Sequence, residues 1–386
     1  ESEGFATAIG GERSMNLRLE ALDSTGVHSL LESLLGDAIP NGLEEFVTAR
    51  SAGNPFFLQE LVRSLQEEEV LVPVDGGWRM RPGWDAETLP ATIEEVLSAR
   101  LDALPRPAAA MLQTVSVIGR RVSLPLLDAV AEGLAEIEPS LAHLLERGLL
   151  ERGRDGGEDV VIFHHALVQD AAYSRLLRRQ RRTLHLRVAE VAESLYGAGD
   201  ETIDLLARHL YLGEAGEKAA EYLVRAGARA RRLFANTEAI LHYGRAVEVA
   251  RGDAALAADL PEILLELADL CELVGDYDEA LKLYTEVRDE TRDVRAWRGL
   301  ASTFRKQGEF VDALAVVDQA FSTDALVGRD LRPLWLERGW TLSVMGRYDE
   351  GVDALEAGLI LDERKDDEVA GQLLLQTARA ETLLGV

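Results

Sequence analysis

Most of the chain places apolar residues at helical spacing. After Ser24, the expected N-cap of the first helix, they stand at Val27, Leu30, Leu31, Leu34 and Leu35. Residues three and four apart share one face of a helix, so this pattern predicts an amphipathic helix. The apolar residues of 43–47 predict a second helix, whereas 15–19 is interpreted as an edge strand.

A sharply defined turn precedes the third predicted helix. Gly53-Asn54-Pro55 is followed by the apolar residues Phe56, Phe57, Leu58, Leu61, Val62 and Leu65. Asn54 is a favourable N-cap, and Pro55 suits the first helical position, where its missing N–H costs nothing. Further on, 70–80 predicts a β-hairpin around Asp75-Gly76-Gly77.

The following segment has the element order of a winged-helix domain. Thr92 and Glu95 form a capping box at the start of a helix. Strands at 149–151 and 160–163 flank a glycine-containing turn. Helices are predicted at 106–118, 123–132, 138–147, 165–177 and 180–195. Gly and Pro residues indicate boundaries near 85–90 and 197–200.

The last half of the chain contains an internal repeat. Gly275-Asp276-Tyr277-Asp278-Glu279-Ala280-Leu281 recurs from Gly308 and again from Gly346, at steps of 33 and 38 residues. Eleven residues before each glycine stands a large residue, Leu264, Trp297 or Trp335, and seven before it a small one, Ala268, Ala301 or Gly339. A fixed period of this length predicts stacked helix pairs.

These positions resemble the tetratricopeptide repeat. We therefore expect a mainly α protein, in which an N-terminal helical segment and a winged-helix domain are followed by an α-solenoid; the resemblance described below implies that the N-terminal segment is a helical lid. Tyr277, Phe310 and Tyr348, which share one repeat position, are expected in the core. An earlier copy has Gly227 at the small position and Tyr243 downstream.

Counting 39 residues beyond Gly346 reaches Gly385, with Leu374 and Ala378 at the large and small positions. The chain ends one residue later, after the first helix of a repeat. We expect a piece of a longer protein, truncated there, since a solenoid normally ends in a polar capping helix. The alternative is that 372–384 is itself the cap.

Charge excludes some classes of partner. Lys and Arg total 41 against 68 Asp and Glu, a net charge of −27, which disfavours nucleic acid and anionic membranes. Six arginines and no acid lie in 173–189, so DNA contact stays open there, beside pairing with the acidic repeats. One cysteine rules out an internal disulfide. With no membrane span or signal sequence in the pattern, a cytoplasmic location is expected.

The chain carries no self-sufficient active site. A phosphate loop needs Gly-Lys followed by Ser or Thr, and none of Lys218, Lys282, Lys306 and Lys365 follows a glycine. There is no Gly-x-Ser-x-Gly elbow or His-Glu-x-x-His, and the histidines lack paired metal-ligand spacing. We therefore expect no enzyme and no metal site in this chain.

Several segments together resemble bacterial signal-transduction ATPases with numerous domains (STAND). They are Gly53-Asn54-Pro55-Phe56-Phe57, Leu89-Pro90-Ala91-Thr92-Ile93, Arg100-Leu101 and Phe163-His164-His165-Ala166-Leu167-Val168-Gln169-Asp170-Ala171-Ala172-Tyr173. The resemblance implies that 1–84 is the end of an ATPase module and its lid, 85–198 the winged helix, and 199–386 a repeat sensor.

The resemblance also implies a nucleotide site. The lid turn, Gly53, Asn54 and Pro55, would lie against ADP or ATP in the full-length protein, and His165 would reach the β-phosphate of ADP. Ala166 stands where relatives usually have Asp, so His164 is the alternative histidine. The phosphate loop would lie upstream, and we expect no tight nucleotide binding by this chain alone.

Three functions follow as expectations. The first is a non-catalytic regulatory and sensor role, in which the lid and winged helix hold a nucleotide-dependent resting state and the repeat groove binds a protein or peptide. Upstream ATPase and effector domains would then be further partners. The second is a transcription regulator whose winged helix contacts DNA. The third is an ATPase, possibly with a linked nucleotide cyclase, only in the full-length protein.

Overall fold

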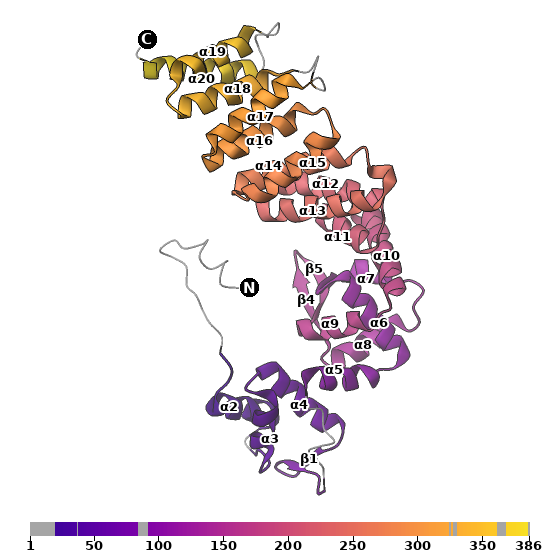
Figure 1. Ribbon diagram of the computed structural model, residues 1–386. Coiled ribbons are helices and arrows are strands. Elements are labelled where there is room, and N and C mark those ends of the chain that lie inside the picture. The colour runs from indigo at the N-terminus through magenta and orange to yellow at the C-terminus, as the bar shows by residue number, and fades with distance from the viewer. Residues whose placement is uncertain are drawn as a thin grey trace. The chain divides into compact units, whose positions relative to one another are not determined.

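A computed structural model describes residues 20–36, 38–83, 92–323, 326, 330–360 and 368–384 (Figure 1). The chain forms two compact units, Glu1–Leu177 and Arg178–Val386. Helices account for most of the described residues of each unit, which confirms the mainly α class. The strand expected at 15–19 and the boundary expected near 85–90 lie outside the described residues.

The described residues up to 83 belong to the segment predicted as the lid, and we keep that name for them. Its elements are α2 (Ser24–Leu35), α3 (Leu43–Ser51), α4 (Pro55–Glu67), β1 (Leu71–Val74) and β2 (Gly77–Met80). The strands pair as the predicted hairpin, and apolar side chains of the helices and β1 share one buried core. Asp23, not Ser24, caps α2, because its carboxylate accepts a hydrogen bond from the Gly26 N–H at 2.8 Å.

Residues 92–177 of the same unit belong to the segment predicted as the winged helix, and we keep that name for them. Its elements are α5 (Ile93–Asp102), α6 (Arg106–Ile118), β3 (Arg121–Ser123), α7 (Leu124–Val130), α8 (Ile137–Glu146), β4 (Leu150–Asp155), β5 (Glu158–Phe163) and α9 (Ala166–Ser174). The antiparallel sheet has the order β3-β5-β4. The Thr92 hydroxyl accepts from the Glu95 N–H at 3.2 Å, as the predicted cap requires.

The second unit is a succession of antiparallel helices (Figure 1). They are α10 (Arg178–Tyr196), α11 (Ile203–Leu212), α12 (Glu217–Arg232), α13 (Asn236–Gly252), the short 3₁₀ helix η2 (Ala254–Leu256), α14 (Leu260–Val274), α15 (Tyr277–Glu290), α16 (Val294–Gln307), α17 (Phe310–Ser322), α18 (Arg332–Val344), α19 (Tyr348–Ile360) and α20 (Glu368–Leu384). Each α-helix packs on the next, and α16 also contacts α14 and α18. We call α12, α14, α16, α18 and α20 the A helices.

The sequence repeat coincides with the helix pairs. Gly275 and Gly308 are the C-caps of α14 and α16, and Gly346 follows Met345, the C-cap of α18. Their φ angles of +87°, +86° and +79° favour glycine. Ala268 and Ala301 are fully buried. A Cβ at Gly339 would overlap the Leu355 side chain. Small residues therefore stand where paired helices approach most closely.

The burial expected for one aromatic position of the repeats is wrong. Tyr277, Phe310 and Tyr348 are half-buried rather than in the core, and the buried rings of the solenoid include Tyr243 and Tyr284. Each of these two fills the space beside a glycine. A Cβ at Gly227 would lie 2.7 Å from the Tyr243 ring, and one at Gly299 would overlap Tyr284.

The register expected for the last repeat is off by one. Leu374 is 56% exposed, and Ala378 is exposed, whereas Leu373 and Thr377 are buried. The step from Trp335 to the large position of α20 is therefore 38 residues, the same as the preceding step between glycines. Gly385 lies outside the described residues.

The boundary between the compact units differs from the one expected near residue 198. It falls between Leu177 and Arg178, so α10 belongs to the second unit. The physical reason is that α10 packs along α11, with His185 of α10 and His209 of α11 both buried and their Nδ1 atoms 2.8 Å apart.

Candidate functional site

The lid turn, Gly53–Pro55, is built by two backbone requirements. The Asn54 side chain accepts hydrogen bonds from the Phe56 and Phe57 N–H groups at 3.0 and 3.2 Å and so caps α4, with Pro55 as its first residue. Gly53 has a φ of +75°, and a Cβ there would lie 2.5 Å from the Leu22 carbonyl oxygen. The fold itself therefore requires glycine and a capping residue at this turn.

His165 lies directly against the residue that follows the turn. Its ring stacks on the Phe56 ring, with centroids 3.6 Å apart and planes inclined by 10°. Its Nδ1 accepts a hydrogen bond from the Leu167 N–H at 3.2 Å, so His165 caps α9. The structure thus brings together the lid turn and the histidine that the sequence singled out far apart.

The protonation state of His165 follows from its surroundings. Burial, and secondly the positive charge of Arg120, lower the pKa of His165 below its ordinary value. The neutral imidazole is therefore the main form at pH 7. Because Nδ1 accepts from a backbone N–H, the ring proton resides on Nε2, which is a hydrogen-bond donor.

His164 occupies a different environment. It is exposed, its Nδ1 lies 3.6 Å from Glu151 Oε2, and it borders a cavity of about 390 Å³. The rest of that cavity is lined by Leu34 and by the α4 residues Gln59, Glu60, Val62, Arg63 and Gln66. The two adjacent histidines therefore differ: His165 caps a helix beside the lid turn, and His164 faces a polar cavity.

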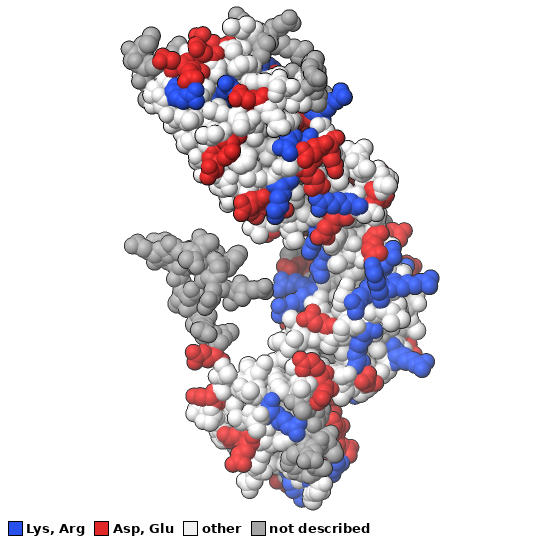
Figure 2. Space-filling view, in the orientation of Figure 1, with Lys and Arg blue, Asp and Glu red and all other residues white. Residues whose placement is uncertain are grey.

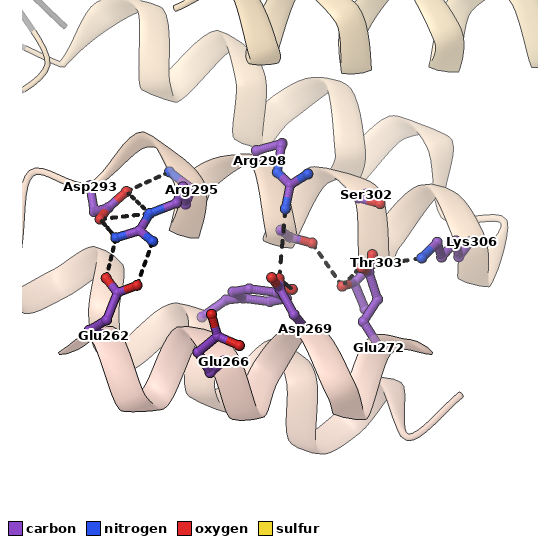
Figure 3. A network of polar contacts seen from close by, with 12 residues as sticks. Glu262, Glu266, Asp269, Glu272, Asp293, Arg295, Arg298, Ser302, Thr303 and Lys306 are labelled. Atoms are coloured by element: carbon purple, nitrogen blue, oxygen red, sulfur yellow. Dashed lines mark hydrogen bonds and ion pairs between the residues drawn. The ribbon is translucent and has the colours of Figure 1, made fainter. Parts of the chain in front are cut away.

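A ladder of ion pairs joins neighbouring A helices in the repeats. Figure 3 shows acids of α14 facing bases of α16. Arg295 donates to both carboxylate oxygens of Glu262 at 2.9 and 2.5 Å. The other pairs are Arg298 with Asp269 at 3.6 Å and Lys306 with Glu272 at 3.2 Å. Sequence reasoning missed this ladder, although acids at 262, 266, 269 and 272 share one helical face.

The contact between the next two A helices, α16 and α18, contains an ion pair and an aromatic ring. Arg305 of α16 donates to Glu337 of α18 at 3.0 Å, and both side chains are more than nine-tenths buried. Burial raises the pKa of Glu337, against the opposing effect of Arg305. The same guanidinium lies 3.9 Å from the centre of the Trp340 ring. Trp340 remains 36% exposed, and Val344, one turn further, is 53% exposed.

Three of the six arginines of 173–189 pair with acids. Arg175 bonds Asp102 at 2.8 Å, and Arg178 and Arg182 both bond Glu214, at 2.7 and 3.0 Å. On the face in Figure 2, basic and acidic side chains are interspersed over the repeat helices. The third helix of the winged-helix order, α8, carries Glu138 and Glu146 and neither Lys nor Arg. These observations disfavour phosphate contact, which needs unpaired positive charge.

Neither a group of metal ligands nor a membrane-spanning helix occurs among the described residues. Within the ranges given above, no three His, Cys, Asp or Glu side chains are grouped as metal ligands would be. No helix among those ranges has both the length and the apolar composition of a bilayer span.

Comparison with known sequences gives one distant relative and no family. No protein-family model matches the chain. An uncharacterized protein of Rhizobium meliloti (strain 1021) is 27% identical over 297 residues, which cover 72% of this chain and 29% of that protein. The chain thus spans less than a third of the length of this curated relative.

Comparison with solved structures gives distant helical neighbours. A STAND protein with a tetratricopeptide repeat sensor from Pyrococcus horikoshii matches with a TM-score of 0.38 and 12% identity, over 97% of this chain and 59% of that one. The TPR2AB domain of yeast Sti1 in its pHSP90 complex scores 0.26 at 17% identity, over 55% and 88%. Yeast Tom70 scores 0.27 at 13% identity, over 89% and 82%. At these TM-scores the repeat architecture rests on the chain's own period and helix packing.

Proposed function

We propose that the second unit binds a protein or peptide along its A helices. The observation that carries this proposal is the exposed apolar surface on two neighbouring A helices. Trp340 and Val344 of α18 are 36% and 53% exposed, and Leu374 and Leu375 of α20 are 56% and 55% exposed. Helices α18 and α20 contact each other directly. Apolar side chains exposed on adjacent helices of a highly charged chain are typical of a binding surface.

Trp340 is the expected anchor of this surface. A ring held in place by Arg305 loses little conformational freedom when a partner covers it, and truncated tryptophans are among the costliest interface changes. The charges of the ion-pair ladder of α14 and α16 mostly have partners within the unit. They would therefore help to orient the bound segment rather than supply most of its affinity. The proposed ligand is therefore a segment with an apolar side chain that packs on Trp340.

The test is partner capture followed by a measured affinity. We expect Trp340→Ala to weaken binding roughly 30-fold, the effect of losing an interface hot spot. The matched control is Leu241→Ala, which removes an apolar side chain that is 50% exposed on α13 rather than on an A helix. Equal affinity for wild type and Trp340→Ala, with unchanged helicity, would contradict the proposal.

We further propose that the lid and winged helix hold a nucleotide-dependent resting state in the full-length protein. The support is the position of His165 beside the lid turn and its neutral ring with a proton on Nε2. Such a donor suits a phosphate oxygen of ADP. We assign hydrolysis, and any linked effector activity, to segments of the full-length protein other than this chain.

ADP dissociation from the full-length protein tests this second proposal. A hydrogen bond to a charged group contributes about 1.5–3 kcal/mol, so His165→Ala is expected to weaken ADP retention roughly 10- to 150-fold. His165→Ser is the matched variant, because serine preserves the N-cap of α9 while removing the imidazole. If both variants retain ADP as wild type does and His164→Ala does not, the phosphate contact belongs to His164.

A further inference from the structure

Two neighbouring A helices, α12 and α14, end in turns of the same backbone geometry. After α12, the Ala235 N–H donates to the Ala230 carbonyl oxygen at 3.0 Å. After α14, the Asp276 N–H donates to the Cys271 carbonyl oxygen at 2.9 Å. Each bond joins residues five apart, as in a Schellman motif, so the two turns are equivalent. Phe234 therefore occupies the place that Gly275 has in the second turn.

Both turns expose apolar side chains. The exposed fractions are 62% and 87% in the first turn and 62% and 48% in the second, at Leu233, Phe234, Leu273 and Val274. We call these four residues the turn patch. The two turns adjoin, because α13 packs on both helices and Arg231 of α12 forms an ion pair with Glu266 of α14. The corresponding turn after α16 has Lys306 and Gln307, which end the patch.

The turn patch lies between charges of opposite sign. Residues 222–237 contain four arginines and no acid, whereas 262–281 contain seven acids and no base. Arg232, beside the first turn, lies 3.4 Å from Asp200, and both side chains are largely exposed, so this pair is weak. Asp276 and Asp278, beside the second turn, are also exposed. The patch is thus positive at one end and negative at the other.

A surface with this charge pattern is complementary to a copy of itself. A two-fold rotation places the first turn of one copy on the second turn of the other, and it forms the same contact a second time. At both contacts arginine then faces aspartate around an apolar centre. Because both halves of the contact lie on one patch, the assembly closes at two copies rather than growing into a filament.

We propose that the turn patch is the interface of a symmetric dimer of this chain. Phe234 is its anchor, because an aromatic ring on a hydrogen-bonded turn loses little conformational freedom when it is covered. Its φ of +58° is a strained conformation of the kind that persists where binding uses it. Four apolar side chains in each copy make a small interface, so we expect a dissociation constant of about 10–100 µM.

The experiment is sedimentation velocity of the full 386-residue chain without nucleotide or peptide. The concentration runs from about 1 to about 300 µM, so that mass action populates both monomer and dimer. Phe234→Ala is expected to weaken association roughly 30-fold, because each dimer loses the ring twice. The matched control is Ile360→Ala, which removes an apolar side chain that is 83% exposed at the end of α19, outside the turn patch.

Two results would overturn the dimer. One is a chain that stays monomeric at every concentration, which leaves the turn patch to a different protein. The other is Phe234→Ala that associates as wild type does, with unchanged circular dichroism, which places the contact between copies elsewhere.

Charge reversal tests the two-fold pairing. Arg232→Glu and Asp278→Arg each bring like charges together in a dimer of that variant, and each is expected to weaken association roughly tenfold. In an equimolar mixture of the two variants, every mixed dimer again has opposite charges at both contacts, so association is expected to recover. Failure of the mixture to recover, or wild-type association of both variants alone, would overturn this pairing. Neither ADP nor a peptide is present, so the outcome is independent of both proposed functions.

Discussion

Phe234 is held in a conformation that suits glycine, and we predict that Phe234→Gly stabilises the chain. The residue stands seven positions after the small residue Gly227, as Gly275 stands seven after Ala268. Its φ is +58°, against +87° at Gly275, and its side chain is 87% exposed. The first copy of the repeat therefore keeps the left-handed turn but places a phenylalanine in it.

The magnitude follows from three opposing contributions. Left-handed backbone costs a residue with a Cβ roughly 1–2 kcal/mol. Glycine loses more conformational freedom on folding, which costs about 0.5–1 kcal/mol. The ring contributes little packing, because 87% of its surface stays in water. The net expectation is a gain of about 0.5–1 kcal/mol in the free energy of unfolding of this repeat.

Hydrogen exchange of the amides of α12 and α13 is the assay, because a solenoid registers a substitution locally. The expected gain corresponds to roughly two- to fivefold slower exchange in those helices. Phe234→Ala is the control: it removes the ring but keeps the strained backbone, so exchange stays near wild type. Gly275→Phe is expected to have the opposite sign in α14 and α15. Faster exchange in Phe234→Gly than in Phe234→Ala would refute the strain argument.

Two further predictions concern buried positions. Burial, and then the charges of Arg208 and Arg181, lower the pKa of His185 to about 4. The unfolded chain binds a proton at this histidine at a higher pH than the folded chain does. Acidification from pH 6.5 to about 4 is therefore expected to lower the free energy of unfolding by about 3 kcal/mol. Denaturant titrations should find a weaker dependence of this free energy on pH in His185→Gln. Gly339→Ala forces a methyl group into Leu355 and is expected to cost about 1–3 kcal/mol. In Gly371→Ala nothing lies within 4 Å of the new methyl group, so thermal unfolding should show a small gain.

Features with a local cause were predictable from the sequence. Asn54, Thr92 and the left-handed glycines of the repeats depend on hydrogen bonds and backbone angles within a few residues. The strand β3 was missed, because its three residues are too few to show a period. The half-burial of Tyr277 was also missed, since repetition marks equivalent positions but not how deeply each is covered.

The contacts of the candidate site depend on tertiary packing that the sequence does not display. Glu60 belongs to a helix beside other acids and would pass for a solvated residue. It is buried because Arg100, 40 positions away, reaches it from α5. The stacking of Phe56 on His165 joins residues that are 109 positions apart. The two halves of the site could each be named, but not their contact.

Ion pairs between arginine and glutamate have two different effects in this chain, and the effect depends on whether the pair is buried. The pair of Arg295 and Glu262 is about half exposed, and such pairs contribute little to stability, so the repeat ladder mainly selects which helix faces align. The pair of Arg100 and Glu60 is buried, so loss of either partner leaves a charge that water cannot reach. Both uses favour arginine, whose planar fork binds a carboxylate through two donors, and only four of the 41 positive residues are lysine. Lysine at position 100 would keep the positive charge beside Glu60 but not the simultaneous contacts of Arg100 with Glu60 and the Arg147 carbonyl.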